Sequence, residues 1–97
     1  MGYREILAAL ADETRRGILQ ELRRGRRSAG ELAEALGVSP QALSYHLAKL
    51  KRAELVRETR KGNFIYYEPD LTVLDEALVW LTELRWGECD EAVKADN

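Results

Sequence analysis

Four polar or aromatic side chains recur at helical spacing between residues 41 and 49, and their chemistry suits contact with base pairs and phosphates. The Gln41 amide can pair with a base edge, most naturally that of adenine. Ser44 permits a close approach, the Tyr45 ring can meet a thymine methyl, and Lys49 can neutralise a phosphate. Taken singly, Gln41 and Ser44 fit an ordinary exposed helix surface. An outward aromatic such as Tyr45 indicates a surface that something covers.

One amphipathic helix positions these side chains. Ser39 can cap its amino terminus, and Pro40 suits the first helical position, where a missing N–H costs no hydrogen bond. At about 100° per residue, Leu43, Leu47 and Leu50 form one stripe that must face a core. The opposite and flanking faces carry Gln41, Ser44, Tyr45, Ala48, Lys49 and Arg52.

His46 lies about 60° from the leucine stripe, at the edge of the expected core. We interpret it as a boundary histidine that is hydrogen-bonded to its neighbours. A contact with a DNA phosphate is the alternative.

A β-hairpin is expected directly after this helix. Residues 55–60 and 63–68 are rich in β-formers, and Lys61-Gly62 lies between them as a turn. Arg60 and Lys61, with Arg57, make the tip cationic, so that it could clamp phosphates or enter a minor groove. Charged residues also protect exposed strand edges, and the two roles are compatible.

Capping residues mark where the other helices begin and end. Asp12 and Asp70 are placed to cap the second and last helices, and Ser28 with Glu31 forms a capping box before the third. Gly37 ends that third helix.

Apolar stripes and these caps predict helices over residues 3–10, 13–24, 29–36 and 71–86. The order of four helices, a hairpin and a last helix defines a mainly α (α+β) protein with a winged helix-turn-helix. We expect one DNA-binding and dimerisation domain over residues 1–87, and a polar, flexible tail over residues 88–97.

The charge is unevenly distributed although the net charge is −2. Residues 15–61 contain 12 Lys or Arg against 5 Asp or Glu, and residues 68–97 contain 2 against 9. A basic middle suits phosphate neutralisation, and solvated helix faces are the plainer explanation. No stretch approaches the roughly 20 apolar residues of a membrane span, and the first residues lack a signal-peptide core. We therefore expect a cytoplasmic protein with no membrane partner.

Catalysis and metal binding are not expected. Ser44 and His46 are two residues apart on a helix and do not face each other, so they form no dyad. The spacing suggests neither a phosphate-cradling glycine loop nor a paired-carboxylate pocket. One cysteine, Cys89, and one histidine cannot supply a metal site in each subunit, so no metal or cofactor is expected.

The first and last expected helices carry more apolar surface than a small monomer requires. In the last helix the apolar side chains span about 180°, whereas a surface helix needs a stripe of little over 100°. A two-fold homodimer would cover the surplus, and a larger monomer core is the alternative. A dimer predicts a pseudo-palindromic site with half-sites about 34–36 Å apart. The expected interface residues are Tyr3, Ile6, Leu7, Leu10, Leu74, Leu78 and Leu81.

Four segments together resemble the ArsR-type bacterial repressors: LADETRRGIL at 10–19, SAGELA at 28–33, SPQALSYHL at 39–47 and GNFIYY at 62–67. The resemblance covers about residues 3–86 in the family's order. It implies a winged helix-turn-helix homodimer that binds operator DNA and represses transcription, with Pro40, Gln41, Ser44 and Tyr45 at the major groove. The full set of candidate DNA contacts is Ser39, Pro40, Gln41, Ser44, Tyr45, His46, Lys49, Arg60 and Lys61.

The sequence departs from the metal-sensing members of that family. They carry a Cys-x-Cys pair near the start of the recognition helix, or His, Asp and Glu ligands on the last helix. Here residues 1–88 contain no cysteine and residues 71–86 no histidine. The chain is therefore most similar to the metal-independent autorepressor (SdpR-like) branch.

Two other functions remain open. One is a redox- or ligand-responsive repressor that uses Cys89 or the dimer interface. The other is a winged-helix protein-interaction module, which would favour apolar residues in place of Gln41, Ser44 and Lys49.

Overall fold

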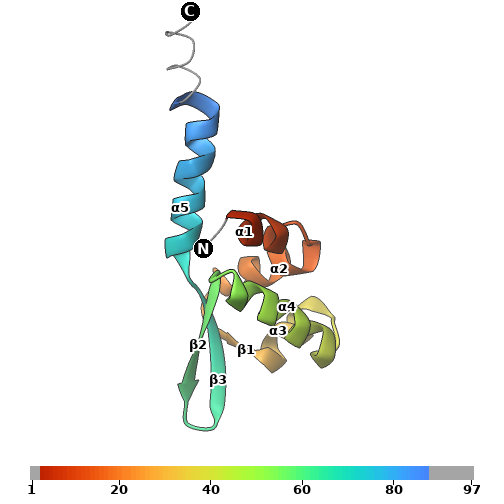
Figure 1. Cartoon of the computed structure of the whole chain (residues 1–97). Coiled ribbons are helices and arrows are strands. Elements are labelled where there is room, and N and C mark those ends of the chain that lie inside the picture. The colour runs from red at the N-terminus through yellow and green to blue at the C-terminus, as the bar shows by residue number, and fades with distance from the viewer. Residues whose placement is uncertain (1–2, 88–97) are drawn as a thin grey trace, which may run out of the picture.

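The computed structural model describes residues 3–87, which fold in the expected order with one added strand (Figure 1). The described elements are α1 (Tyr3–Leu10), α2 (Glu13–Leu22), β1 (Arg27–Ser28), α3 (Ala29–Leu36), α4 (Pro40–Arg52), β2 (Val56–Lys61), β3 (Phe64–Pro69), α5 (Leu71–Thr82) and the π-helical turn η1 (Glu83–Gly87). The predicted tail lies outside the described residues.

The predicted caps are confirmed in atomic detail. The Asp12 carboxylate accepts from the backbone N–H of Arg15, and the Ser39 hydroxyl accepts from that of Ala42. Ser28 and Glu31 form the complete capping box, and Asp70 caps α5 through Thr72 N–H. Helix α2 ends at Leu22, two residues before the expected end, because its carboxyl-terminal cap lies at Arg23.

The sheet has three antiparallel strands in the order β1-β3-β2. Lys61 pairs with Phe64, so the turn residues are Gly62 and Asn63, and each long strand begins one residue later than predicted. Gly62 has a φ of 62°, which suits glycine because it lacks a Cβ. Strand β1 was not predicted: two residues, Arg27 and Ser28, are too few to form an alternating pattern.

A left-handed residue connects the fourth helix to the hairpin. After the cap at Ala53, Glu54 takes a φ of 62°. Its N–H donates to the Lys51 carbonyl, and the N–H of Leu55 donates to the Leu50 carbonyl, both at 2.9 Å. This pattern of hydrogen bonds is a Schellman motif. The hydrophobic contact that accompanies such a motif is made here by two fully buried leucines, Leu50 and Leu55. It fixes the angle at which the hairpin leaves α4.

The core lies between the helices and the inner face of the sheet. Its largest fully buried side chains come from the first four helices and from the residue before β2: Ile6, Ile18, Leu22, Leu32, Leu43, Leu50 and Leu55. The expected α4 stripe is confirmed, since Leu43, Leu47 and Leu50 are each at most 4 % exposed.

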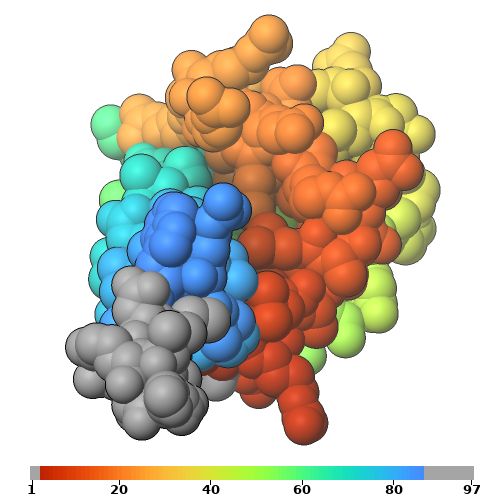
Figure 2. All heavy atoms as spheres, turned by 90° about the horizontal axis from the view of Figure 1, so that it is seen from above, coloured from red at the N-terminus to blue at the C-terminus, as the bar shows by residue number. Residues whose placement is uncertain are grey.

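Helix α5 begins against this body and then extends away from it (Figure 1). Val73 and Ala77 are buried, whereas Leu78, Val79 and Leu81 are exposed. Seen from above, α5 and α1 lie next to each other on one face of the molecule (Figure 2). Among the described residues, no helix is both long and apolar enough to cross a membrane.

Candidate nucleic-acid interface

The outer face of α4 is exposed as the sequence predicts. Gln41 and Ser44 are exposed, and Tyr45 is 57 % exposed although it is a large aromatic residue. Pro40 and Ser39 are exposed at the amino-terminal end of the helix. The Ser39 oxygen accepts the capping hydrogen bond, so its hydroxyl hydrogen can still be donated to a ligand.

Two side chains of this face contact the Tyr45 ring. The Lys49 ammonium lies 5.4 Å from the ring centroid, a cation–π contact. The His46 ring meets the same ring edge-on, with centroids 5.4 Å apart. The tyrosine ring therefore lies against two other side chains of its own helix.

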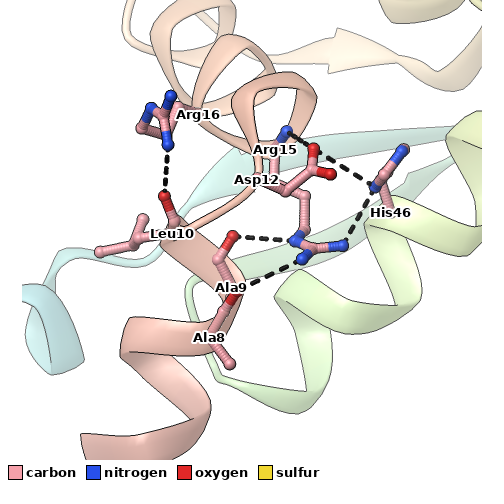
Figure 3. Close-up of polar contacts among 7 residues, drawn as sticks. All are labelled: Ala8, Ala9, Leu10, Asp12, Arg15, Arg16 and His46. Carbon is pink, nitrogen blue, oxygen red and sulfur yellow. Dashed lines mark hydrogen bonds and ion pairs between the residues drawn. The ribbon is translucent and has the colours of Figure 1, made fainter.

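His46 connects α4 to α2 at the edge of the core (Figure 3). Its Nδ1 lies 3.2 Å from Nη1 of Arg15 and 3.9 Å from the Asp12 carboxylate. Arginine can only donate, so His46 Nδ1 is the acceptor in this hydrogen bond. The hydrogen bond from the backbone N–H of Arg15 lowers the pKa of the Asp12 carboxyl.

Arg15 and Arg16 were not predicted from the sequence to take part in this site. Arg15 donates to the carbonyls of Ala9 and Ala8, at 2.8 and 3.3 Å, and Arg16 donates to that of Leu10 at 2.8 Å (Figure 3). These carbonyls belong to the last turn of α1, where carbonyl groups have no N–H partner within the helix. The excess of basic residues from residue 15 onward does not predict these hydrogen bonds, because a count of charges does not show which carbonyls the arginines contact.

The hairpin register places the two tip cations on opposite faces. Lys61 pairs with Phe64 and shares its face, whereas Arg60 pairs with Ile65. Glu58 lies two residues from Arg60 on that same face and accepts a hydrogen bond from Lys51 of α4, which raises the pKa of the lysine. Arg60 is therefore on the side of the hairpin that faces α4.

Ion pairs neutralise the base of the hairpin but not its tip. Arg57 pairs with Glu68 at 3.2 Å. Within residues 3–87, neither Arg60 nor Lys61 has an acidic partner within 4 Å, and both are exposed. The tip therefore keeps two cations available for an anionic ligand.

The predicted interface residues divide into exposed and covered ones. Leu7, Leu78 and Leu81 are 44–55 % exposed. Leu10 and Leu74 pack partly on the core, and Tyr3 stacks on Trp80. For Ile6 the expectation needs correction: it is 1 % exposed in the core of its own chain and has no surface left to offer.

Among the described residues, no group of three or more His, Cys, Asp or Glu side chains is placed to hold a metal ion. Cys89 lies outside the described residues.

The helix pair α3–α4, followed by a β-hairpin, defines a winged helix-turn-helix protein, and comparison with known proteins agrees. Residues 10–59 match the family model described as a helix-turn-helix domain. The transcriptional repressor SdpR of Bacillus subtilis is 42% identical over 76 residues, which are 78% of this chain and 84% of that protein.

Solved structures are similar over most of the chain. An ArsR-like transcriptional regulator from Rhodococcus has a TM-score of 0.84 and 36% identity, over 96% of this chain and 87% of the other. A homodimeric winged helix-turn-helix DNA-binding domain from Mycobacterium bovis has a TM-score of 0.69 and 30% identity, over 86% and 79%. The chain belongs to the ArsR-type family of winged helix-turn-helix transcriptional regulators. These relatives are named as a transcriptional repressor, a transcriptional regulator and a DNA-binding domain.

Proposed function

We propose that this protein is a homodimeric, sequence-specific DNA-binding repressor of transcription that acts in the cytoplasm without sensing a metal. The observation that carries the proposal is the exposed outer face of α4 beside a hairpin tip whose two cations, Arg60 and Lys61, have no acidic partner within residues 3–87. A helix of this kind enters the major groove, and a cationic wing contacts the phosphates. Relatives named as a repressor and as a homodimeric DNA-binding domain support it.

The roles within the interface follow from side-chain chemistry. Gln41 and Ser44 can hydrogen-bond base edges, and Tyr45 can reach a base or a thymine methyl. Lys49, Arg60 and Lys61 neutralise phosphates, and Ser39 with Pro40 lies at the end of α4 that approaches the backbone. His46 is directed toward Arg15 and acts through position rather than through a phosphate contact.

The dimer brings two such helices to one operator. Leu7, Leu78 and Leu81 supply its exposed apolar surface, which a monomer would leave in water. Because the dimer has two-fold symmetry, its operator is pseudo-palindromic, with half-sites about one helical turn apart.

A ligand-responsive repressor is the second candidate. A mainly apolar cavity of about 440 Å³ lies between α2 and α5 and is lined in part by Leu19, Leu22, Leu55, Leu71 and Leu74. A small apolar ligand there would touch the base of α5 and could alter the dimer.

Binding to DNA across a salt series tests the proposal. The wild-type protein is used to select duplexes from a random library, and the selected duplex is compared with a scrambled one by fluorescence anisotropy. We expect tight binding to a pseudo-palindrome, with affinity that falls steeply as salt rises because bound counterions are released.

A chelator arm and a zinc arm test metal independence in the same assay, and both should leave the affinity unchanged. If no duplex is selected, or if binding does not depend on salt, the DNA-binding proposal is wrong and the protein-interaction module takes its place.

A further inference from the structure

Arg15 joins three helices through one side chain. It lies in the first turn of α2, its Nε and Nη2 donate to α1 carbonyls, and its Nη1 donates to His46 of α4 (Figure 3). Within residues 3–87, no other side-chain hydrogen bond connects α4 to α1 or α2. The guanidinium is therefore the polar joint between these helices.

The chemistry of the joint requires arginine. The three bonds leave one planar group in three directions, which a lysine ammonium on a flexible stem cannot reproduce. The cation also lies at the carboxyl terminus of α1, where it complements the partial negative charge of the helix dipole. Arg16 does the same for Leu10, but within residues 3–87 it makes no hydrogen bond to α4.

Contacts continue from this joint in both directions. On one side Tyr3 of α1 stacks on Trp80 of α5, with ring centroids 4.6 Å apart. On the other side the His46 ring touches Tyr45 on the exposed face of α4. The joint thus lies between the helices that carry the exposed apolar surface and the face proposed to touch DNA.

We propose that Arg15 and His46 are positioning residues that set the orientation of α4 relative to α1, and that discrimination between operator and other DNA depends on them. This inference rests on the proposed function. A helix that is held in one orientation presents its side chains to base edges in register, whereas contacts with phosphates tolerate small rotations. Loss of the Arg15–His46 joint should therefore weaken binding to the operator and leave binding to DNA of other sequences unchanged.

Three variants distinguish this positioning role from an effect of the Arg15 charge and from an effect on the stability of the fold. Arg15→Lys keeps the cation and loses the joint, His46→Leu removes the acceptor, and Arg16→Lys is the matched control that alters only the cap of α1. Each is measured at a temperature where circular dichroism shows it folded, against the selected duplex and a scrambled duplex of equal length.

For Arg15→Lys and His46→Leu we expect affinity for the selected duplex to fall about tenfold, as loss of one charge-assisted hydrogen bond implies. Affinity for the scrambled duplex should change less than about twofold, and the salt slope should stay the same because no phosphate contact is lost. The double variant should lose little more than either single one, since both break the same bond. Arg16→Lys should keep the wild-type ratio.

A measurement without DNA gives an independent check. Hydrogen exchange of the α4 amides should speed up in Arg15→Lys and not in Arg16→Lys, because only the first frees α4. The proposal is overturned if Arg15→Lys keeps the wild-type ratio of affinities, or if α4 exchanges equally in both variants. Equal weakening on both duplexes with a smaller salt slope also overturns it, since that marks a phosphate contact. In those cases wild-type binding still stands, so the proposed function survives; if the wild-type protein itself selects no duplex, both fail.

Discussion

The phenol ring of Tyr3 stacks on the indole of Trp80, with ring centroids 4.6 Å apart and planes inclined by 8°. The first helix and the last are thereby held together by a contact between residues 77 positions apart in the sequence. Helix α5 otherwise extends beyond the helical body (Figure 1), so this stack helps to fix its direction. That direction decides where the exposed leucines of α5 lie relative to α1.

A double-mutant cycle should detect this stack. Replacing Tyr3 and Trp80 by alanine, singly and together, should reveal a coupling of about 1 kcal/mol in the free energy of unfolding, as expected for a close aromatic pair. Urea unfolding at one fixed protein concentration measures it, because a dimer's stability depends on concentration. Additive losses would show that the two rings do not stabilise each other.

Leu78→Asp should dissociate the proposed homodimer. The substitution places a charge on the exposed apolar face of α5, where a partner would have to bury it. Sedimentation equilibrium should show monomers, and binding to the selected duplex should be lost with the dimer. Val79→Asp is the control: its side chain is similarly exposed, at 59 % against 55 %, but points about 100° away around the helix. A Leu78→Asp protein that remained dimeric would place the interface elsewhere.

Lys61→Ala and Gln41→Ala should weaken DNA binding in different ways. Lys61 lies at the hairpin tip, so its loss should weaken binding to all duplexes similarly and reduce the salt slope by about one. Gln41→Ala should leave that slope unchanged and relax the preference at one base-pair position per half-site. Anisotropy titrations with a panel of singly altered duplexes distinguish them. Arg23→Ala, which removes an exposed cation that lines the cavity between α2 and α5, should change neither property.

Local signals in the sequence were sufficient for most of the fold. Capping side chains such as Ser28 and Glu31 are only three residues apart, so short sequence motifs predict the caps and the first residues of helices. The same holds for the outer face of α4, because the helical period alone separates Tyr45 from Leu47. Strand β1 could not be predicted, because it exists only through pairing of Arg27 and Ser28 with distant β3.

The joint at Arg15 shows why the rest of the site was missed. Its partners are the carbonyls of Ala8 and Ala9 and the ring of His46, which lies 31 residues away. No spacing rule connects them, since the contact depends on how three helices pack. Ile6 illustrates the same limit: its stripe on α1 was correctly judged apolar, but packing decides which members face the core.

Acid should remove the contribution of the Asp12 cap to stability. The pKa of this carboxyl is below its usual 3.8 because its ionised form accepts the Arg15 N–H. A carboxyl whose pKa is lower in the folded state stabilises the fold fully above the unfolded value, and the gain disappears as pH falls through the lowered pKa. The wild-type melting temperature should exceed that of Asp12→Asn at pH 7, and the two should converge below about pH 3.8. A difference that persisted unchanged to pH 2 would rule out ionisation as its source.

Glu54→Gly should stabilise the protein. Glu54 is exposed with a φ of 62°, and within residues 3–87 its side chain makes no hydrogen bond or ion pair, so the substitution relieves backbone strain and loses no contact. We expect a gain of roughly 0.5–1 kcal/mol in the free energy of unfolding, since glycine is favoured at this position of a Schellman motif. Gly37→Ala is the opposite test: its φ is 67° and an added Cβ would meet no atom within 4 Å, so any loss comes from the backbone alone. Urea unfolding should show the free energy of unfolding raised in Glu54→Gly and lowered in Gly37→Ala. A Glu54→Gly variant less stable than wild type would mean that the entropy gained by the unfolded chain outweighs the strain relieved in the folded one.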